Sequence, residues 1–168
     1  MSDGRDRVVQ WLRDAHAMEQ QAETMLNAQA SRLEHYPKLR QRIQRHIEET
    51  KTQAARLQTC LGQLASDTSG VKDLAGRLAA MAQGLGGMFA GDEVVKGAMA
   101  GYVFEHVEIA SYVSLISAAE HEGLPEAARV CRENLEEERA MADWLQNHLP
   151  DVTRAFLARE QAGGPAKR

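Results

Sequence analysis

The chain has 168 residues, which is enough for one domain with a sizeable hydrophobic core. Its net charge of −4 comes from acids interleaved with Arg and Lys, so it offers no basic surface for nucleic acid. No apolar run reaches the roughly 18 residues of a membrane span, and the N-terminus carries no apolar signal segment. We therefore expect a cytoplasmic protein that binds neither membrane nor nucleic acid.

Four long helices are predicted from apolar spacing and helix-breaking residues, with no strand-like alternation. They cover residues 3–34, 38–64, 93–120 and 125–150, with short helices at 71–83 and after Pro150. A single domain of residues 1–162 precedes a flexible tail of residues 163–168. The connections are tight within each pair of helices and long between the pairs. We therefore predict an all-α, ferritin-like four-helix bundle with a short crossover helix between the second and third long helices.

Three of the long helices carry a glutamate inside an apolar stripe. The stripes step by alternating fours and threes, which keeps every member on one helix face, and they contain Glu19, Glu105 and Glu138. A buried carboxylate is costly unless it is paired, protonated or bound to a metal. One such glutamate is often explained by a place near the bundle end or by a partnering Arg. Three in one bundle instead indicate a shared cation.

The second helix has two readings. Its core stripe contains either Leu39, Ile43, His46, Thr50, Gln53 and Leu57, or Ile43, Ile47, Thr50, Ala54, Leu57 and Leu61. Dimetal bundles usually take a Glu-x-x-His pair from this helix. The only such spacing here runs from Glu48 to Lys51, whose ammonium cannot ligate, so His46 and Glu49 are the available pair in reverse order.

Further polar residues flank these candidate ligands. Glu108 lies three residues after Glu105 on one face, and Tyr112 is placed to donate a hydrogen bond to a ligating carboxylate. His106 lies about 100° around the same helix. On the first helix, His16 precedes Glu19 by three residues and is placed to reach inward.

Several segments together resemble the YciE/YciF-type ferritin-like family: "DAHAMEQQ", "HIEET", "EHVEIASY" and "GLPEAARVCRENLEEER". The resemblance runs from about residue 10 to residue 148. It implies a ferritin-like bundle, often dimeric, associated with stress responses and binding iron or a similar metal. By position it implies functional residues at Glu19, His46, Glu49, Thr50, Glu105, His106, Glu108 and Glu138.

The chain departs from the family pattern at two positions. Family members tend to have a tyrosine where this chain has His16, and an Asp four residues after the acid that matches Glu138. Ala142 stands at that second position, and Asp143 is one step off the face. The loss of a carboxylate there predicts weaker metal binding, or none.

The leading hypothesis is a dinuclear iron or manganese protein, because hard carboxylate ligands suit these metals. Its expected ligands are Glu19, His46, Glu49, Glu105, Glu108 and Glu138, surrounded by Tyr112, His106, His16 and Lys51. Such a site would consume dioxygen or peroxide together with Fe(II), as a ferroxidase or peroxidase-like oxidoreductase. The alternative is a metal-free or metal-poor structural, stress-associated bundle that acts through partners, in which Lys51, Arg45 and Arg139 neutralise the acids.

The crossover predicts a homodimer, because its apolar residues exceed what a short solvated helix needs. They are Leu74, Leu78, Met81, Leu85, Met88 and Phe89.

Overall fold

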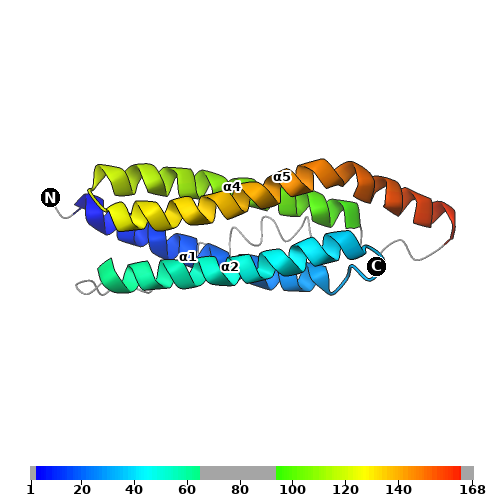
Figure 1. Ribbon diagram of the computed structural model, residues 1–168, viewed down its shortest axis with the longest axis horizontal. Helices are drawn as coiled ribbons and strands as arrows, with labels where there is room; N and C mark the ends of the chain where they lie inside the picture. Colours follow the sequence, from blue (N-terminus) through cyan, green and yellow to red (C-terminus); the bar gives the residue numbers. More distant parts are fainter. Residues whose placement is uncertain (1–2, 65–93, 164–168) are drawn as a thin grey trace.

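The computed structural model describes residues 3–64 and 94–163, which form four long helices. They are α1 (Asp3–Ala30), α2 (Pro37–Leu64), α4 (Val94–His121) and α5 (Pro125–Gln161). The helices lie side by side as two antiparallel hairpins, α1 with α2 and α4 with α5, and packing is most extensive within each hairpin (Figure 1). The predicted all-α bundle is thereby confirmed. The predicted crossover helix and the predicted dimerisation residues lie outside the described ranges.

The corner between α4 and α5 is built by Gly123 and its two neighbours. Gly123 has a φ of 67°, a left-handed conformation that suits glycine because it has no Cβ. The N–H of Leu124 donates to the carbonyl of Ala119 over 2.8 Å, and the buried Leu124 side chain packs against the core. Pro125 then opens α5, where its missing N–H costs no helix bond.

Two helix ends differ from the prediction. The first helix ends at Ala30 rather than near residue 34, because the chain turns there to bury Leu33 and Tyr36. The fourth helix does not end at Pro150 but continues through it to Gln161. Proline removes one helix hydrogen bond without forbidding the helix. Val152 and Phe156 pack on the core beyond that point and sustain α5.

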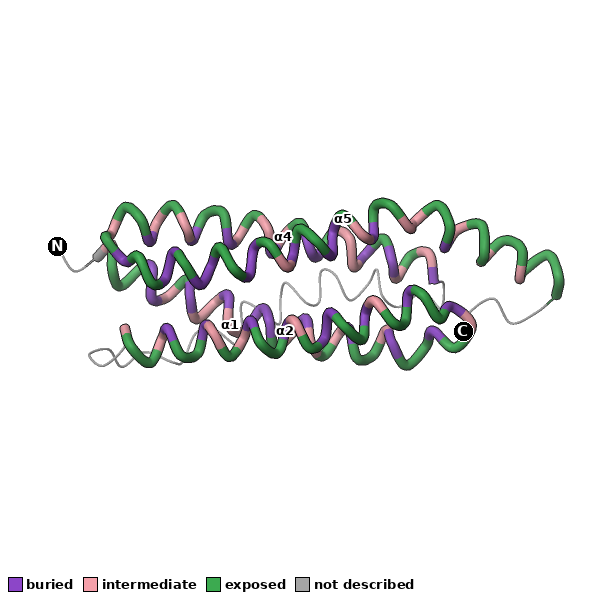
Figure 2. The backbone as a smooth tube through the Cα atoms, in the orientation of Figure 1, coloured by how far each residue is buried: buried purple, intermediate pink, exposed green. Residues whose placement is uncertain are grey.

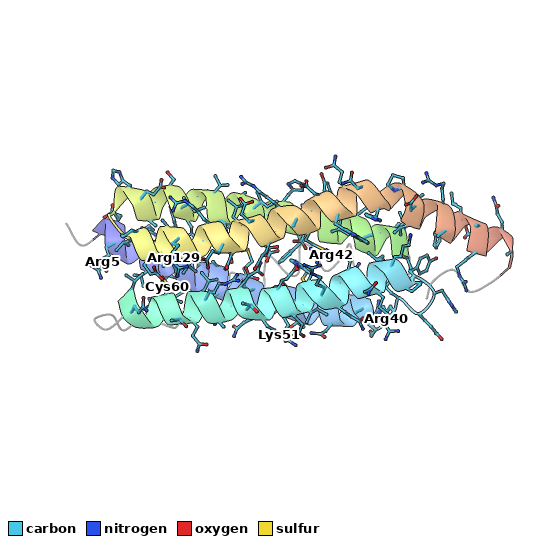
Figure 3. All side chains as sticks on the ribbon, in the orientation of Figure 1. Arg5, Arg40, Arg42, Lys51, Cys60 and Arg129 are labelled. Atoms are coloured by element: carbon cyan, nitrogen blue, oxygen red, sulfur yellow. The ribbon has the colours of Figure 1, made fainter. Side chains whose placement is uncertain are left out.

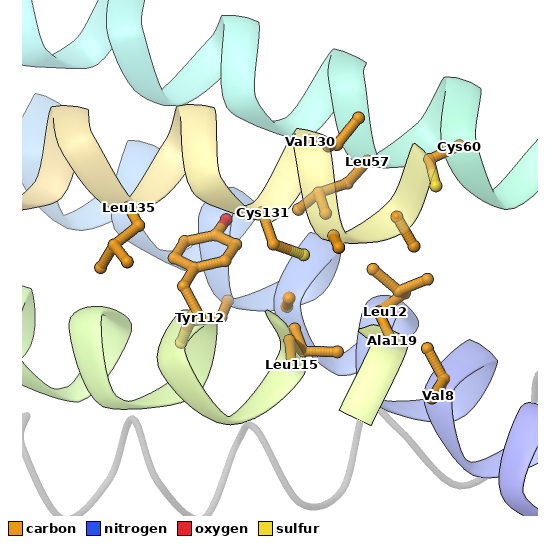
Figure 4. Packing of buried hydrophobic residues seen from close by; sticks show 14 of the residues in the cluster. Val8, Leu12, Leu57, Cys60, Tyr112, Leu115, Ala119, Val130, Cys131 and Leu135 are labelled. Atoms are coloured by element: carbon orange, nitrogen blue, oxygen red, sulfur yellow. The ribbon is translucent and has the colours of Figure 1, made fainter. Parts of the chain in front are cut away.

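Buried residues recur along each of the described helices (Figure 2). They form two apolar clusters, with a layer of buried polar residues between them. Charged side chains such as those of Arg40, Lys51 and Arg129 lie on the outside (Figure 3). The Leu12 cluster includes Leu12, Leu57, Tyr112, Leu115, Cys131 and Leu135 (Figure 4). The Ile43 cluster includes Leu26, Leu39, Ile43, Ala98, Met141 and Leu145.

The polar layer is clearest on α2 and α5. On α2, the buried Thr50 and Gln53 lie between Ile47, which belongs to the Ile43 cluster, and Leu57, which belongs to the Leu12 cluster. On α5, Glu138 falls between the two clusters. None of the four described helices has a stretch long and apolar enough to cross a bilayer.

Candidate metal centre

All four described helices contribute an ionisable side chain to the polar layer. Glu19 comes from α1, His46 from α2, Glu105 and Glu108 from α4, and Glu138 from α5. Each of the five residues is at most 2% exposed. The three stripe glutamates therefore converge in the interior, together with Glu108 and one histidine.

The α2 stripe follows the first of its two readings. Leu39, Ile43, His46, Thr50, Gln53 and Leu57 are all buried, whereas Ala54 and Leu61 of the second reading are only half-buried. Because a helix turns once per 3.6 residues, this phase points the His46 ring directly at the acids of α4 and α5.

His46 forms the centre of the cluster. Its Nε2 lies 3.2 Å from Oε2 of Glu105 and 3.3 Å from Oε2 of Glu138. One ligand atom from each of these residues lies within 4.8 Å of the other two, so the three residues could hold one metal ion. Two hard carboxylate oxygens and one imidazole nitrogen form a donor set that iron and manganese accept.

Glu49 holds the other side of the His46 ring. Its Oε2 lies 2.8 Å from Nδ1 of His46 and 3.1 Å from Nη1 of Arg42, and its Oε1 lies 3.1 Å from Nε of Arg45. Both oxygens of this predicted ligand are thus engaged away from the cluster. Glu49 instead accepts the Nδ1 proton of His46 and leaves Nε2 directed at Glu105 and Glu138, an arrangement common behind metal-bound histidines.

A chain of hydrogen bonds connects Glu19 to the surface between α2 and α5. Arg56 pairs with Glu137 at 2.8 Å, and its Nη1 donates to Oδ1 of Asn134 at 3.1 Å. Nδ2 of Asn134 donates to the Tyr112 hydroxyl at 3.0 Å, and that hydroxyl donates to Oε1 of Glu19.

The direction of this chain is fixed by its outer end. Arg56 has no acceptor atom, so Oδ1 of Asn134 must accept and its amide nitrogen must face Tyr112. The Tyr112 oxygen then accepts from Asn134, and its proton goes to Glu19. The sequence reasoning placed Tyr112 correctly but missed Asn134 and Arg56. The signal for Asn134 was its position one helical turn before Glu138.

Burial sets the protonation of the carboxyl groups. Burial raises the pKa of Glu105 to about 8, although the charge of His46 opposes the shift. Burial and then repulsion from Glu138 raise the pKa of Glu19 and of Glu108 well above the ordinary value.

Two acids of the layer keep their charge. Burial opposes the ionisation of Glu138, but the hydrogen bond from His46 holds its pKa below the ordinary value. Partial burial likewise opposes the ionisation of Glu49, yet hydrogen bonds from His46 and Arg42 hold its pKa at about 2. Burial lowers the pKa of His46, and the charge of Glu105 and its carboxylate neighbours outweigh burial and raise that pKa well above 6.5. These directions favour a protonated His46 between the carboxylates of Glu138 and Glu49.

The acids also present oxygens without partners. Within the described residues, Oε2 of Glu19, Oε1 of Glu108 and Oε1 of Glu138 are buried and accept no hydrogen bond. A buried carboxyl oxygen without a hydrogen-bond partner is unfavourable, and a cation would satisfy it when the acid gives up its proton on metal binding. The residues present therefore fit a metal ion of the type that carboxylate bundles hold.

Several residues predicted around the site lie elsewhere. Lys51 is exposed and its Nζ pairs with Oε1 of Glu48 at 2.7 Å, so it does not compensate the buried acids. His106 is exposed and packs edge-on against Tyr102. His16 is half-buried one turn before Glu19. Ala142 is buried one turn after Glu138, so the missing family carboxylate is an apolar contact here.

The chain matches a protein-family model described as a domain of unknown function, DUF892, over residues 4–158. A solved structure of a protein from Xanthomonas campestris pv. campestris is similar, with 44% identity and a TM-score of 0.79 over 95% of this chain and 99% of that one. The stress protein YciF of E. coli is similar at 26% identity and a TM-score of 0.76, covering 90% and 97% of the two chains.

A third solved structure, YcfI of Rhodopseudomonas palustris, is described as a putative structural protein. It is 28% identical, with a TM-score of 0.68 over 85% of this chain and 92% of that one. The family model spans nearly all of the described helices, and the YciF likeness agrees with the motifs of the sequence. The chain therefore belongs to the DUF892 family, the YciE/YciF-type ferritin-like proteins.

Proposed function

We propose that this protein binds a dinuclear iron or manganese centre in its polar layer and uses it to consume peroxide or dioxygen. The observation that carries the proposal is the set of five buried donors from four helices, several with unpartnered oxygens. An apolar core gains nothing from such a set without a cation. The description of the relative YciF as a stress protein supports a role in oxidant defence.

The donors of the centre would be Glu19, His46, Glu105, Glu108 and Glu138. Glu19 is held through Oε1 by Tyr112, so it offers its free Oε2. The Nδ1 proton of His46 stays in its hydrogen bond to Glu49, and Nε2 becomes available to a metal once it has lost its own proton. Metal binding therefore releases protons from His46 and from the protonated acids, which makes affinity rise with pH.

A bound metal such as Fe(II) would supply the electrons that reduce the oxidant. Two Fe(II) ions would deliver the two electrons that, with two protons, reduce one hydrogen peroxide to two water molecules. The protein contributes the dry surroundings, the fixed carboxylates and the oriented His46 ring.

Elemental analysis tests the proposal most directly. Protein from cells supplied with iron and manganese should contain about two ions per chain, as expected for a dimetal bundle. The double variant His46→Gln, Glu138→Gln should contain almost none, whereas the exposed control Glu136→Gln should match the parent. Metal content in the parent no higher than in the double variant would reject the centre and favour the structural bundle.

A further inference from the structure

Two glycines occupy the interior of α4 on the face toward α1. Glycine destabilises a helix interior relative to alanine, so its presence needs a reason. A Cβ on Gly97 would lie 3.5 Å from Nε2 of Gln29, and one on Gly101 would lie 3.8 Å from Cδ1 of Leu145. Both are ordinary van der Waals distances. Close helix approach therefore does not require glycine at either position.

Gly101 instead lines a cavity between α1 and α4. The cavity has room for about one water-sized molecule. Its walls include Ala22, Leu26, Gln29, Gly101 and Phe104, and it reaches Glu105. Gly97 does not line this cavity. The cavity lies between two helices that pack less extensively than the partners within each hairpin.

The cavity connects solvent with a candidate metal ligand. Its lining includes the half-buried Gln29 and Gly101 as well as the buried Ala22, Phe104 and Glu105. Glu105 is 2% exposed and belongs to the group of converging ligand atoms around His46. A small molecule held in the cavity would lie against Glu105.

The chemistry of the walls selects what can enter. They are mostly apolar and narrow, so a hydrated cation or an anion would lose its water shell without compensation. Dioxygen has no tightly held water shell to lose on this path, and hydrogen peroxide can form a hydrogen bond with the Gln29 amide, which lines it. We propose that the α1/α4 cavity is an entry port through which a small neutral oxidant, dioxygen or hydrogen peroxide, reaches Glu105. Its purpose as an oxidant port rests on the proposed function.

Variants at the two glycines separate the port from helix stability. Gly101→Leu should fill the cavity, and Gly101→Ala should narrow it. Gly97→Ala is the matched control, since it makes the same change one turn away at a residue that does not line the cavity, with its new Cβ at ordinary contact distance from the Gln29 amide. Both alanine variants should fold at least as stably as the parent because alanine favours helix.

The first readout uses metal-free protein. Dissolved dioxygen is paramagnetic, so it should enhance the relaxation of the Ala22 methyl group more than that of Ala127, which is buried in the same Leu12 cluster but does not line the cavity. Gly101→Leu should reduce the enhancement at Ala22 several-fold, Gly101→Ala should reduce it partly, and Gly97→Ala should leave it unchanged. An equal enhancement at Ala22 in the parent and in Gly101→Leu would overturn the port.

The second readout identifies the oxidant and separates the two proposals. In Fe(II)-loaded protein, Gly101→Leu should slow the oxidation of Fe(II) several-fold at unchanged iron content. The oxidation is measured once with dioxygen and once with hydrogen peroxide, and the oxidant whose reaction is slowed is the one that uses the port. A slower uptake of Mn(II) in Gly101→Leu would overturn selectivity for neutral molecules. If neither the parent nor any variant binds iron while the relaxation effect still depends on Gly101, the entry port is supported and the proposed metal centre is rejected.

Discussion

Replacing Glu105 by Gln should stabilise the metal-free protein near neutral pH while it weakens metal binding. Glu105 is buried beside His46 and Glu138, and burial raises its pKa to about 8 from an ordinary value of 4.5. Gln has nearly the same shape as the protonated acid and, like it, can donate a hydrogen bond. It cannot ionise, and it cannot supply a carboxylate to a metal.

The magnitude follows from linkage between protonation and folding. Between pH 4.5 and pH 8 the folded protein keeps the Glu105 proton and the unfolded chain loses it, so stability falls as pH rises. Each pH unit in this window costs about 1.4 kcal/mol. The penalty is absent below pH 4.5, reaches about 3 kcal/mol at pH 7, and levels off above pH 8. Glu105→Gln removes it, so the variant should be more stable by up to that amount.

Urea unfolding of chelator-treated protein from pH 5 to pH 8.5, followed by circular dichroism, measures this difference. The gap between Glu105→Gln and the parent should widen as pH rises, and the exposed control Glu136→Gln should show no such trend. Saturating Mn(II) should reverse the order, because it stabilises only the protein that binds it. A gap that does not change with pH, or a variant less stable at pH 8, would refute the reasoning.

Three further variants test the supporting residues. Tyr112→Phe should cost roughly 1–3 kcal/mol in urea unfolding, because Nδ2 of Asn134 loses the closer of its two acceptors and Oε1 of Glu19 loses its donor; an unchanged midpoint would contradict the directed chain. Glu49→Gln should weaken Mn(II) binding about 10-fold in calorimetric titration by releasing the His46 ring, and a complete loss of binding would instead make Glu49 a ligand. Ala142→Asp should raise metal content and lower the stability of the metal-free protein, since it adds a buried carboxylate one turn after the cluster; unchanged metal content would show that the family carboxylate is dispensable.

The sequence predicts this fold well because the information for it is local. Apolar spacing repeats within each helix, and it identifies Glu19, Glu105 and Glu138 as inward residues without any knowledge of the partner helices. Pro150 shows where local information fails. Its missing N–H predicts a helix end, but contacts of Val152 with the core outweigh that loss.

The site was less predictable because its contacts cross between helices. Glu49 shares a shoulder of α2 with His46, and the spacing alone does not tell a ligand from a residue that holds the ring. The bond from Arg56 to Asn134 joins residues far apart in sequence and depends on the packing of α2 against α5. Lys51 was placed near the acids by sequence proximity, although its side chain points to solvent.

The polar layer also fixes the axial register of each helix relative to its neighbours. Apolar stripes repeat every turn, so a helix displaced by one turn, about 5.4 Å, would still bury hydrophobic residues. The same slip of α5 would carry Glu138 into an apolar cluster and bring Ala142 or Asn134 opposite His46. The observed axial register keeps Glu105 and Glu138 beside His46, and a slip by one turn would separate them. The layer therefore specifies one packing arrangement of the helices in addition to supplying the candidate metal ligands, just as a single polar position sets the alignment of a coiled coil.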